Sequence, residues 1–124
     1  MHPIAARNTV IHARLTERVA ELRRRLGRYK PHELAEPAGG MLIDVVGRLL
    51  AEIYRLVSRE PGARALVRIN RKGTYTNGAL LAALRDGQVA LDAYRHAHWD
   101  HEGDYTEDWL TFEGLDPEAL DPLP

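Results

Sequence analysis

The sequence predicts a small, mostly α-helical domain with two long packed helices and an acidic C-terminal tail. Apolar residues recur at helical spacing in two stretches, 9–28 and 41–59, and a Pro- and Gly-containing connector at 31–40 separates them. The 124 residues are 44% hydrophobic and 28% charged, which is typical of one globular domain and far from a disordered composition.

The first predicted helix spans residues 9–28. Its apolar residues recur at spacings of four, four, three and four, which places them on one stripe: Ile11, Leu15, Val19, Leu22 and Leu26. The arginines fall largely off this stripe, so the helix has an apolar face and a cationic back. Pro31 ends the helix, because the residue before a proline avoids the helical region.

The second predicted helix spans residues 41–59. Its apolar residues cover more than half of the circumference: Leu42, Val45, Val46, Leu49, Leu50, Ile53, Leu56 and Val57. Such a wide apolar surface is typical of a buried helix, so this one is predicted to be central. In the connector before it, residues 32–35 favour a single turn of helix.

The third quarter of the chain leaves alternatives open. Residues 65–70 fit either a short strand or hairpin, which would make the fold α+β, or a further helical turn. A turn at 71–75 and a cap at Thr76 or Asn77 predict a helix over 78–85, which Asp86-Gly87 breaks. Residues 88–98 fit a strand or a helix, and the abundance of alanine favours the helix.

Charge is distributed unevenly along the chain. The net charge is −1, but residues 1–30 hold eight basic and two acidic side chains, and residues 97–124 hold nine acidic side chains and no Lys or Arg. We expect residues 1–103 to form a single globular helical domain. Residues 104–124 are expected to form an acidic, aromatic-containing tail that docks on it through Trp109, Leu110, Phe112 and Leu115.

The basic end of the chain predicts a polyanion or protein partner. The side chains expected to contact nucleic acid or that partner are Arg18, Arg23, Arg24, Arg25, Arg28, Lys30, Arg71 and Lys72. The alternative is that the basic and acidic ends neutralise each other within the fold or between neighbouring copies.

A histidine cluster predicts a metal site. His96, His98, Asp100 and His101 form the pattern H-x-H-x-D-H, which resembles the zinc-binding loop of the metallo-β-lactamase superfamily. The resemblance implies zinc ligation and a zinc-activated water. It covers about eight residues, and no histidine follows His101 to supply the later ligands, so the family is not assigned. If residues 88–98 are helical, His96 and His98 point about 200° apart and cannot share a metal ion on that helix. The alternative interpretation is a polar, histidine-rich end of a helix that leads into the acidic tail.

A second pattern, Arg7-Asn8 followed by His12, resembles the R-N-x-x-x-H motif of HEPN-type ribonucleases. That resemblance implies that Arg7 and His12 act on an RNA phosphodiester, with the cation at the phosphate and the imidazole as the base. The other reading is a helix start capped by Asn8 or Thr9.

Composition narrows the function further. Cysteine is absent, which excludes disulfides, thiolate zinc sites and cysteine nucleophiles in this chain. No targeting segment or membrane-length apolar stretch is visible, so a cytoplasmic protein without membrane contact is expected. We predict a non-catalytic interaction protein within a larger assembly, without a cofactor, that contacts nucleic acid, a protein partner or itself. The alternative is a metal-dependent hydrolase or nuclease that uses zinc at the histidine cluster.

Overall fold

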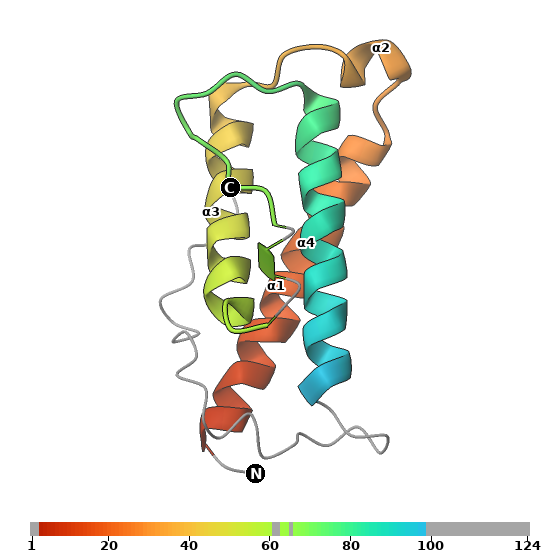
Figure 1. The fold of residues 1–124 in the computed structure, drawn as a ribbon. Coiled ribbons are helices and arrows are strands. Elements are labelled where there is room, and N and C mark those ends of the chain that lie inside the picture. Colours follow the sequence, from red (N-terminus) through yellow and green to blue (C-terminus); the bar gives the residue numbers. More distant parts are fainter. Residues whose placement is uncertain (1–2, 61–62, 65, 99–124) are drawn as a thin grey trace.

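The computed structural model describes residues 3–60, 63–64 and 66–98, and for residues 3–7 and 9 it describes the backbone alone. In these residues the chain forms α1 (Pro3–Gly27), α2 (Pro31–Leu34), α3 (Gly40–Val57) and α4 (Asn77–His98). The three long helices α1, α3 and α4 lie side by side, and the short α2 sits in the connector at one end of the bundle (Figure 1). The prediction of a mostly helical small domain is therefore confirmed.

One aliphatic core joins the three long helices. The predicted stripe of α1 is buried in full, and none of its five residues is more than 2% exposed. The core residues of the other two helices are Ile43, Val46, Leu49, Leu50, Ile53, Leu56 and Val57 on α3, and Leu80, Leu81, Ala83, Leu84, Ala90, Leu91 and Tyr94 on α4. Both predicted apolar faces belong to this single cluster, which confirms that the two predicted helices pack together.

The prediction that α3 is the central helix is wrong. α4 contacts α1, α2 and α3, so it holds the central place. Leu42 and Val45 on α3 are only half-buried and Met41 is 75% exposed, so part of its apolar surface faces away from the core.

α1 begins at Pro3 rather than near Thr9. Proline is tolerated in the first helical turn, where its missing N–H has no partner to lose. Asn8 therefore lies within the helix, and its side chain is fully buried. The predicted cap at Asn8 or Thr9 is wrong.

The predicted break at Asp86-Gly87 is also wrong, because α4 runs without interruption from Asn77 to His98. Gly87 is buried, and a Cβ atom on it would lie 3.1 Å from Leu50 Cδ2 and 3.1 Å from Ile53 Cδ1. The glycine thus allows α3 to approach α4 closely instead of ending the helix. Residues 88–98 are helical, as favoured, and the Oγ1 of Thr76 caps the helix by accepting a 3.1 Å hydrogen bond from the Ala79 amide.

Residues 66–70 form no strand or helix, so the α+β alternative is wrong for the part of the chain that the structure describes. This segment follows α3, and both Leu66 and Ile69 pack partly buried against the helical core. A strand needs the edge of another strand to pair its amides and carbonyls. A neighbouring helix offers no such edge.

Backbone and side-chain hydrogen bonds tie the two connectors together at the α2 end. The Ala38 amide donates to the Tyr75 carbonyl at 2.8 Å, and the Asn77 amide donates to the Glu36 carbonyl at 3.0 Å. The buried Asn77 side chain adds a 2.9 Å hydrogen bond from Nδ2 to the Glu33 carbonyl. These bonds hold α2 against the start of α4.

Among the described helices, none is long and apolar enough to cross a membrane. The predicted division between a domain at 1–103 and a tail at 104–124 falls outside the described residues. It stays a prediction.

Candidate nucleic-acid interface

The formal charge of the helical part of the chain is strongly positive. All 17 Lys and Arg residues precede residue 99, whereas nine of the 18 Asp and Glu residues precede it and nine follow it. Residues 1–98 therefore carry a formal charge of +8, and residues 99–124 carry −9. A charge of this size attracts polyanions over distances of about a Debye length.

Burial of the apolar stripe fixes where the arginines of α1 point. With Leu15, Leu22 and Leu26 inside, the predicted binding residues of α1 lie on its sides and back: Arg24 and Arg25 are exposed, and Arg18 and Arg23 are half-buried. Arg28 and Lys30 follow in the exposed turn. The structure thus brings these six predicted residues together on the last turns of α1 and just beyond them.

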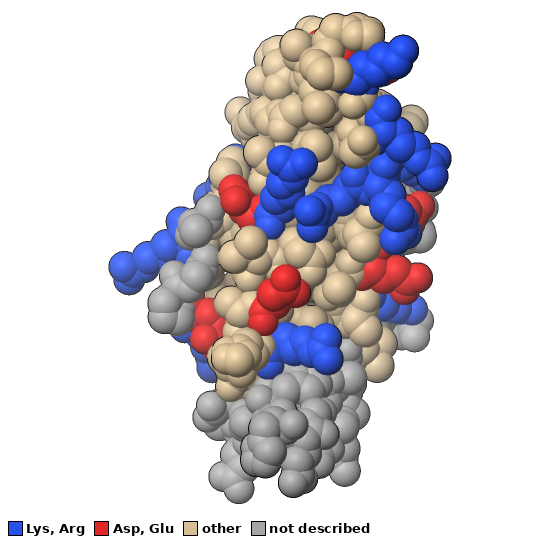
Figure 2. Space-filling model, turned by 90° about the vertical axis from the view of Figure 1, so that its right-hand side faces the viewer, with Lys and Arg blue, Asp and Glu red and all other residues tan. Residues whose placement is uncertain are grey.

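Figure 2 shows Lys and Arg side chains gathered in the upper part of one side of the molecule, with acidic side chains scattered among and below them. One of the acidic partners on α1 is Glu21, whose Oε1 lies 3.4 Å from Nη2 of Arg25. Both side chains of this pair are about half exposed, and such pairs contribute little to stability. Arg25 can therefore exchange Glu21 for a phosphate at small cost.

The other two predicted residues lie on a different part of the surface. Arg71 is held against α3, with its Nη1 3.2 Å from Oδ1 of Asp44, and the same carboxylate binds Nε of Arg48 at 3.2 Å. Lys72 is exposed in the turn, where its amide donates to Oδ1 of Asn70. Arg71 shares the Asp44 carboxylate with Arg48, and this negative charge weakens the attraction of Arg71 for a polyanion.

The histidine cluster is only partly described. His96 is exposed on α4, whereas His98 is buried, with its Nε2 2.6 Å from Oε1 of Glu60. The structure therefore does not bring these two imidazoles together, as the helical spacing predicted. No group of three or more metal-binding side chains occurs among the described residues. Because Asp100 and His101 lie outside them, the metal site and the hydrolase alternative stay predictions.

The histidine of the R-N-x-x-x-H pattern is inside the bundle. His12 is 5% exposed, and its Nε2 lies 2.8 Å from the carbonyl oxygen of Leu91 on α4. A carbonyl oxygen only accepts, so Nε2 carries the proton and donates it. Burial lowers the pKa of His12, with a smaller lowering by Arg95, against raising effects from the Leu91 hydrogen bond and from Asp92.

This geometry favours a structural role for His12. A neutral imidazole that donates to a helix carbonyl ties α1 to α4, and its ring stacks on that of Tyr94 with centroids 6.3 Å apart. A general base must reach a proton of the substrate within about 3 Å. His12 is closed off from any substrate at the surface, and the Arg7 side chain lies outside the described part.

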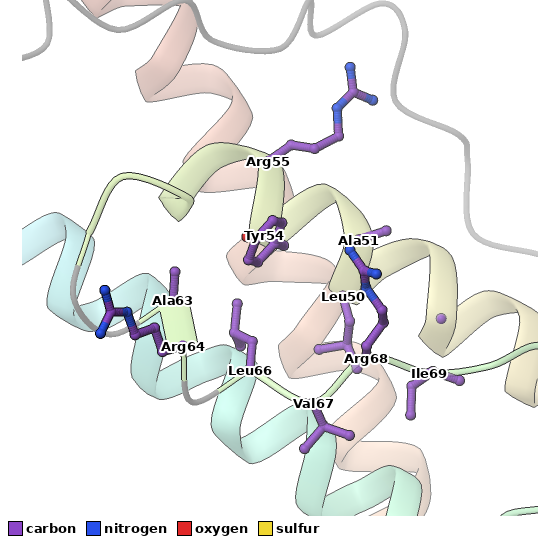
Figure 3. A pocket seen from close by; sticks show the side chains of 11 residues that line it. Leu50, Ala51, Tyr54, Arg55, Ala63, Arg64, Leu66, Val67, Arg68 and Ile69 are labelled. Atoms are coloured by element: carbon purple, nitrogen blue, oxygen red, sulfur yellow. The ribbon is translucent and has the colours of Figure 1, made fainter.

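Sequence reasoning missed a pocket on the other side of the bundle. It has a volume of about 520 Å³ and lies between α3 and the segment 63–69 (Figure 3). Among the described residues its lining is mainly apolar, and the charged side chains there are those of Arg55, Arg64 and Arg68, with no carboxylate. Arginines on both sides of Pro61-Gly62 were the available signal, but only the fold shows that the segment returns along α3.

Comparison with protein-family models, with curated proteins and with solved structures finds no significant match to this chain. What the chain does therefore has to follow from its charges, burial and contacts.

Proposed function

We propose that this chain is a non-catalytic nucleic-acid-binding protein that contacts the phosphate backbone through the arginines of α1. The observation that carries the proposal is the set of exposed cations on a helix whose opposite stripe is wholly buried, within a region of formal charge +8. Lys and Arg contacts to phosphates supply affinity by releasing counterions, and they carry no sequence information. The expected binding is non-specific and strongly dependent on salt.

The arginines expected to contact phosphates lie along one flank of α1. Arg18 and Arg25 are seven residues apart, which is close to two helical turns, so they lie nearly in line and about 10 Å apart along the axis. Arg28 follows in the turn after the helix. Arg23 and Arg24 point about 200° and 100° away from Arg25 around the helix, so they do not lie on this line.

The test is a salt titration of binding to a 20-nucleotide single-stranded RNA and to a duplex of the same length, with binding measured by fluorescence anisotropy. Each neutralised phosphate adds about −0.9 for duplex DNA, or about −0.7 for a single strand, to the slope of log K against log salt. The variant R18Q/R25Q/R28Q should therefore flatten the slope by about 2 to 3. It should also weaken binding at low salt.

A matched control removes the same charge elsewhere. R48Q/R55Q/R59Q takes three exposed arginines from α3 and the turn after it, and it should leave the slope of the wild-type chain nearly unchanged. Equal slopes for the two triple variants would contradict an interface on α1. The absence of detectable binding to either nucleic acid at low salt would contradict the whole proposal.

A protein partner is the second candidate, favoured by the opposite charges within one chain. The +8 of residues 1–98 and the −9 of residues 99–124 allow α1 of one copy to meet the acidic tail of another, or of a partner within a larger assembly. Deletion of residues 104–124 separates the candidates. It should strengthen nucleic-acid binding, because it removes seven negative charges and so raises the net positive charge of the chain, whereas it should abolish self-association through the tail.

A further inference from the structure

The largest apolar side chains of the sequence lie outside the described core. Trp99, Trp109 and Phe112 are the only Trp and Phe residues of the chain, and all follow residue 98. The core of α1, α3 and α4 is aliphatic apart from Tyr94. Aromatic side chains carry a large share of the stabilisation in cores and interfaces. In the segment 107–113, with the sequence Glu-Asp-Trp-Leu-Thr-Phe-Glu, two of them stand between carboxylates.

The pocket beside α3 has the complementary composition. Leu50 and Leu66 contribute to its apolar lining, while Tyr54 is 45% exposed and Val67 46% exposed at the same site. Figure 3 shows Leu66 reaching from the 63–69 segment toward Tyr54 on α3. A volume of about 520 Å³ falls in the range of pockets that enclose compact organic groups.

The charges at the pocket favour an anionic occupant. Arg64 and Arg68 stand four residues apart on the segment, Arg55 stands on α3, and all three are exposed. An apolar peptide flanked by acids matches an apolar floor flanked by arginines, both in packing and in charge. A cationic or purely apolar partner would leave these guanidinium groups unmatched.

The tail of the same chain is close enough to reach the pocket. The end of α4 is tied to the start of the pocket segment, because Nε2 of His98 lies 2.6 Å from Oε1 of Glu60, three residues before Ala63 in the lining. Residues 99–106 span up to about 26–29 Å when extended, whereas the lining residues of α3 extend from Arg55 back to Gly47, about 12 Å along the helix. A short tether also raises the effective concentration of the tail to the millimolar range.

We propose that the pocket between α3 and residues 63–69 is the docking site of the chain's own acidic aromatic segment, residues 107–113. Trp109 and Phe112 cover the apolar lining, and the flanking carboxylates meet Arg64 and Arg68. The proposal does not depend on nucleic-acid binding, since the pocket residues lie apart from the arginines of α1.

The test uses the full-length chain with W99F, which leaves Trp109 as its single tryptophan. Trp109 should emit at shorter wavelength, and acrylamide should quench it several-fold less, than in the same chain unfolded in urea. R64Q/R68Q removes two exposed ion pairs and should shift the docking equilibrium toward the open form by roughly 2- to 30-fold. A second variant, A51E, places a carboxylate at an exposed position of the pocket on α3 and should also release Trp109.

The matched control is R23Q/R24Q, which removes the same charge from α1 and should leave Trp109 protected. Protection that is unchanged in R64Q/R68Q and A51E would overturn the proposal, as would a Trp109 that is fully exposed in the parent chain. Protection that disappears on dilution would also overturn it, because it would show that the segment docks on a second copy. None of these readouts involves nucleic acid, so they stand or fall separately from the proposed function.

Discussion

Substitution of His12 by glutamine tests how the buried imidazole affects stability. His12 is 5% exposed and donates from Nε2 to the Leu91 carbonyl at 2.8 Å. Glutamine carries an N–H donor but does not titrate, so H12Q removes the proton equilibrium and keeps the means to form a hydrogen bond between α1 and α4.

The size of the effect follows from proton linkage. Burial lowers the pKa of His12 from its ordinary value of 6.5. Between that lowered pKa and 6.5, the unfolded chain holds a proton on His12 that the folded chain lacks. The contribution of neutral His12 to the free energy of unfolding is therefore fully present above pH 6.5 and is lost as the pH falls below it. The loss reaches about 1.4 kcal/mol for each pH unit within this window.

The assay is urea unfolding of the wild-type chain and H12Q at several pH values from 7.5 down to 5.5. The free energy of unfolding should decrease with falling pH more steeply for the wild type than for H12Q, by up to about 1.4 kcal/mol per unit. At pH 7.5 the free energies of unfolding of the two proteins should differ by about 1 kcal/mol, because the substitution alters the packing and the hydrogen bond. H32Q is the control, because His32 is exposed on α2 and should keep the wild-type slope.

Parallel pH dependences for the wild type and H12Q would refute this reasoning. They would mean that His12 keeps the same affinity for protons in the folded and unfolded chains. The net lowering of the His12 pKa by burial would then be wrong.

Two further substitutions test the core and the end of α4. Leu49→Ala should lower the free energy of unfolding by about 2–5 kcal/mol, because Leu49 is only 3% exposed, whereas Met41→Ala on the 75% exposed Met41 should be nearly neutral in the same denaturation experiment. His98→Ala should cost about 1–3 kcal/mol, because it leaves the part-buried Glu60 carboxylate without its imidazole partner. Added zinc should leave the melting temperature unchanged, and stoichiometric zinc that is lost in His96→Ala would instead support the metal site.

The sequence predicted correctly what depends on periodicity. The stripe of α1 is buried because its spacing matches one face of a helix, and the apolar stretch of α3 supplies seven buried residues. The cap at Thr76 was also predicted, because a threonine directly before a helical pattern is a preferred N-cap residue. These features are local, so neighbouring residues suffice to predict them.

The errors came from residues whose role depends on another helix. Asp86-Gly87 was predicted to break the helix, because glycine lowers helix stability. The close packing of Gly87 against Leu50 and Ile53 outweighs this low helix propensity. Leu66 and Ile69 fitted either a strand or a helical turn, because propensity does not tell whether an apolar segment packs against a strand or a helix. The pattern around His12 left open a catalytic base or a helix start, and only the packing of α1 on α4 shows that His12 is buried against Leu91.

The helical class, the phase of the α1 stripe and the opposite charges of the two ends could all be predicted from the sequence alone. These follow from composition and from spacings of three and four residues, which do not depend on how the helices are arranged. Three features became visible only in the folded chain: α4 is continuous and central, His12 and His98 are buried in the bundle, and Arg64 and Arg68 stand beside an apolar pocket on α3. Each of these depends on contacts between residues far apart in the chain, and close packing against such neighbours can override a local preference.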